Sequence, residues 1–124
     1  MDMSDKHRIL VIEDENLLRN SLAQQLTEQG YDVREASSGD DAISMLQGAE
    51  YKLIVLDLKM PYIDGFEVLK FVKGTFPKTK VVVLTAYADL TNTQKCKGLG
   101  ADEVLGKPYD IEYLLNTIDI VLKK

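Results

Sequence analysis

Carboxylate, hydroxyl and ammonium side chains follow several short apolar segments of this 124-residue chain. Glu13 and Asp14 follow one such segment, and Asp57 follows another. Thr85 ends a third segment, and Lys107 comes directly after a weaker one. A single aspartate in such a place is usually a turn former or a helix cap. Three carboxylates in equivalent places are harder to explain in that way, and they suggest one shared site.

The three carboxylates favour the binding of a divalent cation. Like charges about 4–6 Å apart repel by roughly 3–4 kcal/mol per pair at an effective dielectric constant near 20. Together with the ammonium of Lys107 the cluster carries a formal charge of -2, which one divalent ion would balance. The expected ligands are all oxygens, and this disfavours zinc and copper. Mg²⁺ binds one or two carboxylates, keeps waters and shares its other positions with a phosphate. We therefore predict a magnesium site.

Thr85 and Lys107 suit a phosphate group held beside that ion, because one donates a hydrogen bond and the other supplies a positive charge. With a metal and a lysine screening an incoming phosphoryl group, a carboxylate can act as nucleophile and form an acyl phosphate. The sequence contains no glycine-rich G-x-x-x-x-G-K loop, so nucleotide binding is not indicated. His7, the single histidine, precedes the first apolar segment. We interpret it as a surface residue away from the site.

The elements that would position these side chains alternate between two hydrophobic patterns. Apolar runs rich in β-branched residues are typical of strands covered on both faces in a parallel sheet. Such runs occupy residues 9–12, 53–56 and 81–84. We assign the briefer segment 33–36 to the same kind of strand, although it contains Arg34 and Glu35, and a weaker strand is expected at 103–106. Five repeats of strand then helix predict an α/β fold with helices on both faces of the sheet. Open sheets of this kind bind ligands beyond the carboxyl ends of their strands, where the reactive side chains stand.

Helical periodicity fills the intervals between the strands. Leucines repeat every four residues before Gly30, which is typical of a helix C-terminal cap. Ser38 with Asp41 three residues later indicates the start of a second helix. A third helix is expected at 65–73 and a fourth at roughly 90–99, and the last begins at Asp110.

The fourth helix has a weaker signal than the others. Its first turn contains middling or poor helix formers, and its apolar stripe is limited to Leu90, Cys96 and Leu99. A helix held this loosely is a candidate for a moving part. A plain surface helix is the alternative.

Composition narrows the class of protein. With 45% apolar and 28% charged residues, the chain is typical of a globular protein and long enough for one domain over residues 1–124. One cysteine excludes an internal disulfide framework and fits a reducing compartment. There is no apolar run of membrane-spanning length, and the start is too polar for a signal peptide. We expect a cytoplasmic protein without membrane partners. A net charge of -5 and no visible basic stripe argue against direct nucleic-acid binding.

Six short motifs make the chain resemble, over essentially its full length, the CheY-like receiver domains of two-component response regulators. In chain order they are Ile12-Glu13-Asp14, Val55-Leu56-Asp57, Met60-Pro61-Tyr62-Ile63-Asp64-Gly65, Leu84-Thr85-Ala86, Gly100-Ala101-Asp102 and Lys107-Pro108-Tyr109. Each motif alone is weak, but six in order at family spacing are very specific. The resemblance implies a flavodoxin-like (βα)5 fold with a five-stranded parallel sheet in the order 2-1-3-4-5.

The resemblance also implies a role for each residue of the expected site. Asp57 would be the phosphoacceptor. Asp14 and the backbone carbonyl of Lys59 would join Asp57 on Mg²⁺, with Glu13 nearby and linked through water. Thr85 would turn its hydroxyl to the phosphoryl group.

Lys107 would pair with a phosphoryl oxygen, with the Ala86 amide helping Thr85. The Lys107-Pro108 bond is expected to be cis. The phosphoryl donor would be a phosphohistidine on a sensor histidine kinase or a histidine phosphotransfer protein. The chain would then be a signalling domain that assists its own phosphorylation and dephosphorylation, not an enzyme.

The resemblance places the output surface on the fourth helix, the last strand and the fifth helix, where it would control a partner or an output domain. Tyr109 and Tyr113 belong either to that surface or to the edge of the core. Homodimerisation on phosphorylation is left open.

Three positions bear on how such a switch would behave. Val104 stands where the family commonly has a tyrosine or phenylalanine that swings inward, and a β-branched residue cannot make that rotation. Coupling would then depend on Thr85 and on backbone shifts. Lys59 and Tyr87 stand at variable positions that tune phosphoryl lifetime. An amine and a ring there could block an attacking water, so our hypothesis is a long-lived phosphorylated form.

Other readings of the same residues are weaker. Phosphatases of the haloacid dehalogenase class need a second aspartate two residues after the nucleophile, and that position here is Lys59. A degenerate receiver that binds partners without being phosphorylated would be expected to lack an acidic residue or the lysine, and all are present. The chain could be a free-standing regulator or a part of a longer one.

Overall fold

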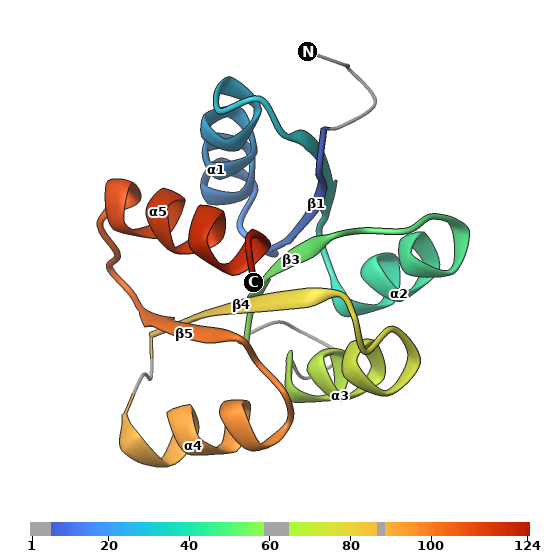
Figure 1. Cartoon of the computed structure of the whole chain (residues 1–124), viewed down its shortest axis with the longest axis vertical. Helices are drawn as coiled ribbons and strands as arrows, with labels where there is room; N and C mark the ends of the chain where they lie inside the picture. Colours follow the sequence, from blue (N-terminus) through green and yellow to red (C-terminus); the bar gives the residue numbers. More distant parts are fainter. Residues whose placement is uncertain (1–5, 59–64, 87–88) are drawn as a thin grey trace.

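The computed structural model describes residues 6–58, 65–86 and 89–124, in which five strands and five helices alternate (Figure 1). The strands are β1 (Arg8–Ile12), β2 (Asp32–Ala36), β3 (Leu53–Asp57), β4 (Lys80–Thr85) and β5 (Glu103–Gly106). The helices are α1 (Asn16–Glu28), α2 (Gly39–Gly48), α3 (Gly65–Thr75), α4 (Leu90–Gly98) and α5 (Ile111–Leu122). Among the described residues, no helix combines the length and the apolar character needed to cross a bilayer.

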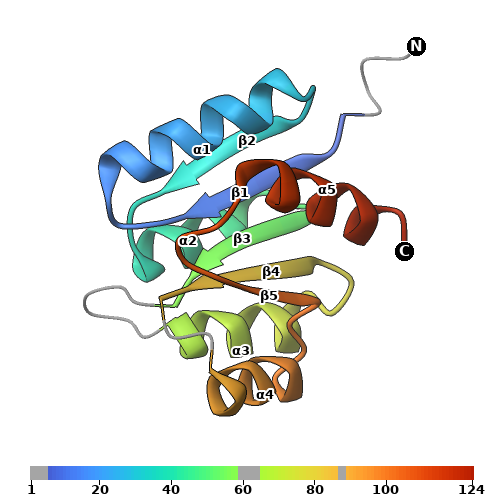
Figure 2. The same cartoon turned by 90° about the vertical axis from the view of Figure 1, so that its left-hand side faces the viewer.

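The strands form one parallel sheet in the order β2-β1-β3-β4-β5, which confirms the predicted topology. Helices α1 and α5 cover one face, and α2, α3 and α4 cover the other (Figures 1 and 2). All five strands point the same way, so the residues after β1, β3, β4 and β5 meet at the carboxyl end of the sheet. The predicted site lies at that end.

The core explains why the central strands are apolar without interruption. Successive side chains along a strand point to opposite faces, and here both faces are covered. On the face of α2, α3 and α4 the strands bury Leu10, Ile12, Ile54, Leu56, Val81 and Val83. On the face of α1 and α5 they bury Ile9, Val11, Leu53, Val55, Val82, Leu84 and Leu105. Each fully buried side chain of this type contributes about 1.5–3 kcal/mol relative to exposure.

Strand β2 departs from that pattern. The prediction that its run is covered on both faces is wrong, because Arg34 and Glu35 are exposed. As an edge strand, β2 pairs only with β1 among the described strands. Arg34 forms an ion pair with Asp32 on the same strand.

The helix boundaries follow the predicted capping residues at two places. The Ser38 hydroxyl accepts a hydrogen bond from the Asp41 amide at 3.1 Å and caps α2. Gly30 has a φ of 97° just after α1, a conformation that glycine adopts without strain. In α4 the predicted stripe is only partly right, since Cys96 is buried and Leu99 packs against the core, but Leu90 is 72% exposed.

Gly65 fixes how α3 begins beside the site. Its amide donates a hydrogen bond to the Leu58 carbonyl at 3.1 Å. A Cβ atom at this position would lie 2.5 Å from the Leu58 Cα, too close for any other residue. The first turn of α3 is therefore held against the backbone that directly follows Asp57.

Candidate functional site

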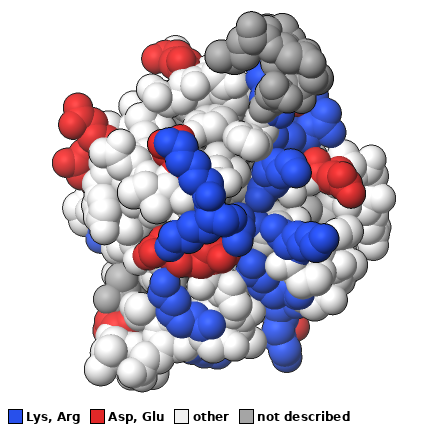
Figure 3. All heavy atoms as spheres, in the orientation of Figure 1, with Lys and Arg blue, Asp and Glu red and all other residues white. Residues whose placement is uncertain are grey.

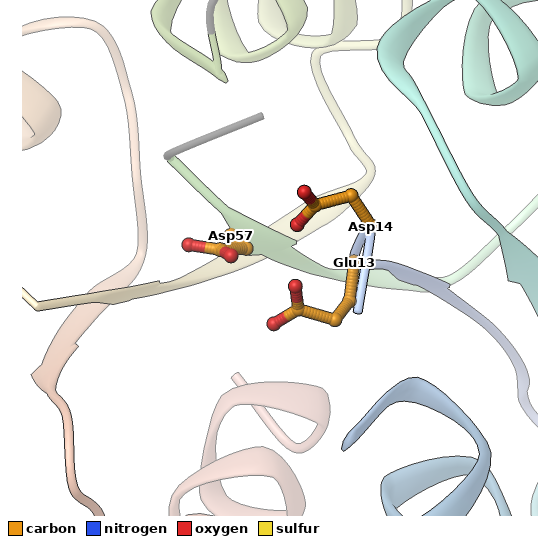
Figure 4. Close-up of side chains that lie close together, drawn as sticks. All are labelled: Glu13, Asp14 and Asp57. Carbon is orange, nitrogen blue, oxygen red and sulfur yellow. The ribbon is translucent and has the colours of Figure 1, made fainter. Parts of the chain in front are cut away.

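Three carboxylates converge at the carboxyl end of the sheet (Figure 4). Asp57 ends β3, and Glu13 and Asp14 follow β1. One oxygen from each of the three lies within 4.8 Å of the others. Glu13 and Asp57 are each only 5% exposed, whereas Asp14 is exposed to solvent. The predicted convergence of these three residues is confirmed.

Lys107 reaches this cluster from the residues after β5. Its Nζ donates hydrogen bonds to Glu13 Oε1 at 2.9 Å and to Asp57 Oδ2 at 3.1 Å. Its backbone amide donates to the Thr85 carbonyl at 2.8 Å. The Lys107-Pro108 peptide bond is cis, as expected. Lys107 therefore connects the ends of β1, β3 and β4, and its ammonium lies beside the Asp57 carboxylate.

Glu13 is fixed from several sides, which sequence reasoning did not reveal. Its Oε2 accepts a hydrogen bond from the Glu15 amide at 3.1 Å, while its Oε1 is bound by Lys107. Its backbone carbonyl accepts a hydrogen bond from Arg19 Nη1 at 3.0 Å. Arg19 Nε in turn binds Glu35 Oε1 on β2 at 3.2 Å. Arg19 therefore links two parts of the chain: the loop after β1, which contains Glu13 and Asp14, and the edge strand β2.

The electrostatics of the cluster appear in two pKa shifts. Partial desolvation raises the pKa of Asp14 although its side chain is exposed, and neighbouring Glu13 raises it further through a hydrogen bond and its negative charge. Burial by itself would lower the pKa of Lys107, but the hydrogen bonds and charges of Glu13 and Asp57 outweigh it and raise that pKa. Lys107 therefore stays protonated, and Asp14 gives up its proton less readily than an isolated aspartate.

The other residues singled out in the sequence differ in burial and in their distance from the cluster along the strands. Thr85 ends β4 and is 2% exposed. Val104 on β5 is partly buried and packs against the core on the α4 side. Tyr109 is partly buried against the core on the α5 side, whereas Tyr113 is 57% exposed. His7 lies before β1, at the opposite end of that strand from the cluster.

Two predicted positions, Lys59 and Tyr87, lie outside the described residues.

The donor set fits a hard divalent cation. The three grouped ligands are carboxylate oxygens with no nitrogen or sulfur among them, as Mg²⁺ and Ca²⁺ prefer. Counted with Lys107, the group has a formal charge of -2 that such an ion would neutralise. The arrangement offers a buried carboxylate and a fixed ammonium beside one cation position, with Thr85 at the end of the neighbouring strand β4. It could therefore hold an anionic group beside Asp57.

Comparisons with known proteins agree with this geometry. A family model described as response regulator receiver domain matches residues 9–119. Response regulator MprA of Mycobacterium tuberculosis is 35% identical over 117 residues, which are 94% of this chain and 51% of MprA. The chain spans about half the length of the curated relatives it matches.

Solved structures share the fold at similar sequence identity. A CheY-like response regulator receiver domain protein from Methanospirillum hungatei superposes with a TM-score of 0.92 at 28% identity, covering 96% of this chain and 95% of that one. A response regulator protein from Burkholderia pseudomallei superposes with a TM-score of 0.83 at 29% identity, covering 94% of this chain and 71% of that one. The latter was crystallised with a phosphorylated aspartic acid, a calcium ion and citrate.

Proposed function

Because the chain belongs to the family of response regulator receiver domains, we propose that it is a phosphorylation-driven signalling switch whose phosphoacceptor is Asp57. The observation that carries this proposal is the Asp57 carboxylate itself. It ends a buried strand, is 5% exposed, lies among acidic oxygens within 4.8 Å and is bound by Lys107. In the related Burkholderia pseudomallei protein an aspartic acid carries the phosphoryl group and a calcium ion is present.

The transfer is a displacement at phosphorus. An oxygen of the Asp57 carboxylate attacks the phosphorus of a phosphohistidine on a sensor histidine kinase or a phosphotransfer protein. The new O–P bond forms an acyl phosphate while the P–N bond breaks, and its electron pair remains on the imidazole nitrogen. Because a carboxylate nucleophile carries no proton to be removed, this displacement needs no general base.

Four side chains around Asp57 have separate tasks. The Lys107 ammonium lies beside the Asp57 carboxylate and can also donate a hydrogen bond to a phosphoryl oxygen. The Thr85 hydroxyl donates to another phosphoryl oxygen. Asp14 and Asp57, with the Lys59 carbonyl, would hold Mg²⁺, and Glu13 would reach it through water. When bound, Mg²⁺ neutralises charge on the phosphoryl group.

The consequence of phosphorylation would be a change in the surface formed by α4, β5 and α5, which would control a partner protein or an output domain. Thr85 and Lys107 stand at the end of β4 and just after β5, next to this surface. They are therefore the groups through which a phosphoryl group on Asp57 would be sensed.

The test is phosphorylation with acetyl phosphate, with and without Mg²⁺, followed by intact mass and peptide mapping. We expect a gain of one phosphoryl group that requires Mg²⁺ and is mapped to Asp57. Asp57→Asn should abolish the gain, whereas Asp40→Asn, in the exposed first turn of α2, should not. No gain under conditions that label another receiver domain would refute the proposal and favour a binding module that is not phosphorylated.

The lifetime of the acyl phosphate is tested on the same material. Following the hypothesis for Lys59 and Tyr87, the phosphorylated wild type should decay slowly, and Tyr87→Ala should decay faster. Equally short half-lives for the two proteins would contradict the hypothesis.

A further inference from the structure

A cavity of about 760 Å³ lies at the opposite end of the sheet from the carboxylate cluster. The residues that line it lie at or just before the starts of β1, β2 and β3, in the last turn of α2, and between α3 and β4. Asp57 lies four residues beyond the start of β3, roughly 13 Å along that strand. The cavity is therefore separate from the proposed phosphorylation site, and its volume is within the range of small-molecule sites.

The floor of the cavity is apolar with one polar group. Leu46 is 3% exposed, and partly buried Phe76 lies beside it in the lining. Tyr51 is 7% exposed, and its hydroxyl has no hydrogen-bond partner in the described part of the chain. No fully buried side-chain polar atom there lacks a partner, so this hydroxyl must remain accessible. Tyr51 is thus an otherwise buried residue that lines the cavity and has an accessible hydroxyl.

The neighbouring Thr79 does not compete for that role. Its hydroxyl donates a hydrogen bond to the Tyr51 carbonyl at 3.0 Å and is occupied. Tyr51 is therefore the polar group of the floor that a ligand could use.

The rim of the cavity is cationic. Lys6, Lys52 and Lys78 are exposed and form no ion pair with any other described residue. Arg8 is already bound to Asp32 at 3.2 Å. Four basic against two acidic lining residues leave a formal charge of +2 on a chain whose net charge is -5. Figure 3 shows Lys and Arg side chains gathered over the region where β1 and β3 begin in Figure 1.

We propose that this cavity binds a small aromatic anion, of the class of aryl phosphates and aryl carboxylates. The ring would lie against Leu46 and Phe76, and the anionic group would pair with the lysines of the rim. A hydrogen-bonding oxygen would meet the Tyr51 hydroxyl. A nucleic-acid backbone would use the cations alone, whereas here the cations surround a hollow with an apolar floor. The proposal does not depend on phosphorylation of Asp57.

The test is an amide NMR titration of the full chain, without Mg²⁺, with phenyl phosphate, 1-naphthyl phosphate and benzoate. Ligands of this size are expected to bind with Kd values on the order of 1 mM, so titrations extend to about 10 mM. We expect saturable shifts of the Tyr51, Lys52 and Thr79 amides. Phenol, which lacks the charge, and inorganic phosphate, which lacks the ring, should bind more weakly.

Variants separate this cavity from general charge attraction. Tyr51→Phe should weaken binding by roughly two- to tenfold through one lost hydrogen bond, and Lys52→Gln by roughly two- to fivefold. Lys70→Gln, at an exposed lysine of α3 outside the cavity, should change nothing. Absence of shifts with all three anions, equal affinity for inorganic phosphate, or tighter binding of a DNA duplex at the same amides would overturn the proposal.

Discussion

Removing one acid of the candidate metal site should make the metal-free protein more stable. The cluster brings three carboxylates within 4.8 Å and offers them one ammonium. Asp14 is the acid that lacks a described cationic partner, and its raised pKa reflects burial and the nearby charge of Glu13. The substitution Asp14→Asn keeps the size and removes the charge. We expect it to stabilise the apo protein and to abolish stabilisation by Mg²⁺.

The magnitude follows from distance and exposure. Two unit charges 4.8 Å apart repel by about 0.9 kcal/mol in water and about 3.5 kcal/mol at an effective dielectric constant of 20. Asp14 meets two such charges, on Glu13 and Asp57. Because Asp14 is exposed, the lower value per pair is the better guide, which gives about 1.7 kcal/mol for both pairs, and Lys107 offsets part of this sum. The net gain should be about 1 kcal/mol, or about 3–5 °C in Tm for a chain of this length. At ten times its Kd, Mg²⁺ should stabilise the wild type by about 1.4 kcal/mol.

Thermal unfolding of wild type and Asp14→Asn, each with and without Mg²⁺, measures both effects. Asp40→Asn should keep the full Mg²⁺ shift of the wild type. The raised pKa of Asp14 means that the folded state holds this proton more tightly than the unfolded chain. Apo wild type should therefore lose stability as pH rises above the ordinary value of 3.8, and the variant should lose less. A variant that melts below the wild type, or that keeps the Mg²⁺ shift, would refute this reasoning.

Three further substitutions test the packing around the cluster. Lys107→Met should cost about 2 kcal/mol at neutral pH, since both acids that it binds lose their cation. Because the pKa of Lys107 is raised above 10.5, wild type and variant should converge in denaturant midpoint only as pH rises past that value. Gly65→Ala should lower stability by at least about 2 kcal/mol, whereas Gly74→Ala, whose Cβ would meet nothing, should not. Arg19→Ala should weaken Mg²⁺ binding roughly threefold or more, through a loosened acidic loop. Its control in the same Mg²⁺ titration is Arg34→Ala, because the ion pair described for this arginine is with Asp32 on the same strand.

The sequence was a good guide to the fold where a local pattern decides the structure. The expected range of β5 matches the observed Glu103–Gly106, and the predicted caps of the first two helices are present. Prediction failed in α4. Leu90 lies six residues before Cys96, which places it about 120° around the helix from that buried side chain, and it is exposed in the first turn. That helix is instead held in part by Lys95, whose Nζ lies 3.9 Å from the centre of the Phe66 ring, a contact that no periodicity reveals.

The candidate site also has some features that the sequence predicts and others that it does not. Parallel strands must bring Asp14 and Asp57 to one edge, so their convergence could be predicted from strand order alone. The bond from Arg19 to the Glu13 carbonyl could not, because it depends on how one helix side chain crosses the loop before it. The cationic rim of the cavity was missed for a related reason. Lys52 and Lys78 are far apart in the chain, and a stripe sought along the sequence does not contain both.

Val104 raises the question of how a phosphoryl group on Asp57 would reach α4 without an aromatic switch residue. A backbone route exists, because the Lys107 amide is bound to the Thr85 carbonyl at 2.8 Å directly after β5. At the other end of β5, Lys97 of α4 donates to the Asp102 carbonyl at 3.0 Å and pairs with Glu103 at 3.7 Å. A shift of Lys107 toward a phosphoryl oxygen would therefore move β5 and, through Lys97, bias α4.

Hydrogen exchange of α4 amides, with and without phosphorylation, distinguishes this route from a side-chain switch. Val104→Ala should keep the phosphorylation-dependent change, because the Lys107 bond at one end of β5 and the Lys97 bonds at the other end remain. Lys97→Ala should raise exchange in both states and reduce the difference between them, although an exposed pair of this kind contributes only about 0.2–1 kcal/mol. If Val104→Ala removed the change and Lys97→Ala left it intact, the signal would pass through the Val104 side chain. In that case Val104 itself would be the switch residue, although it has no aromatic ring.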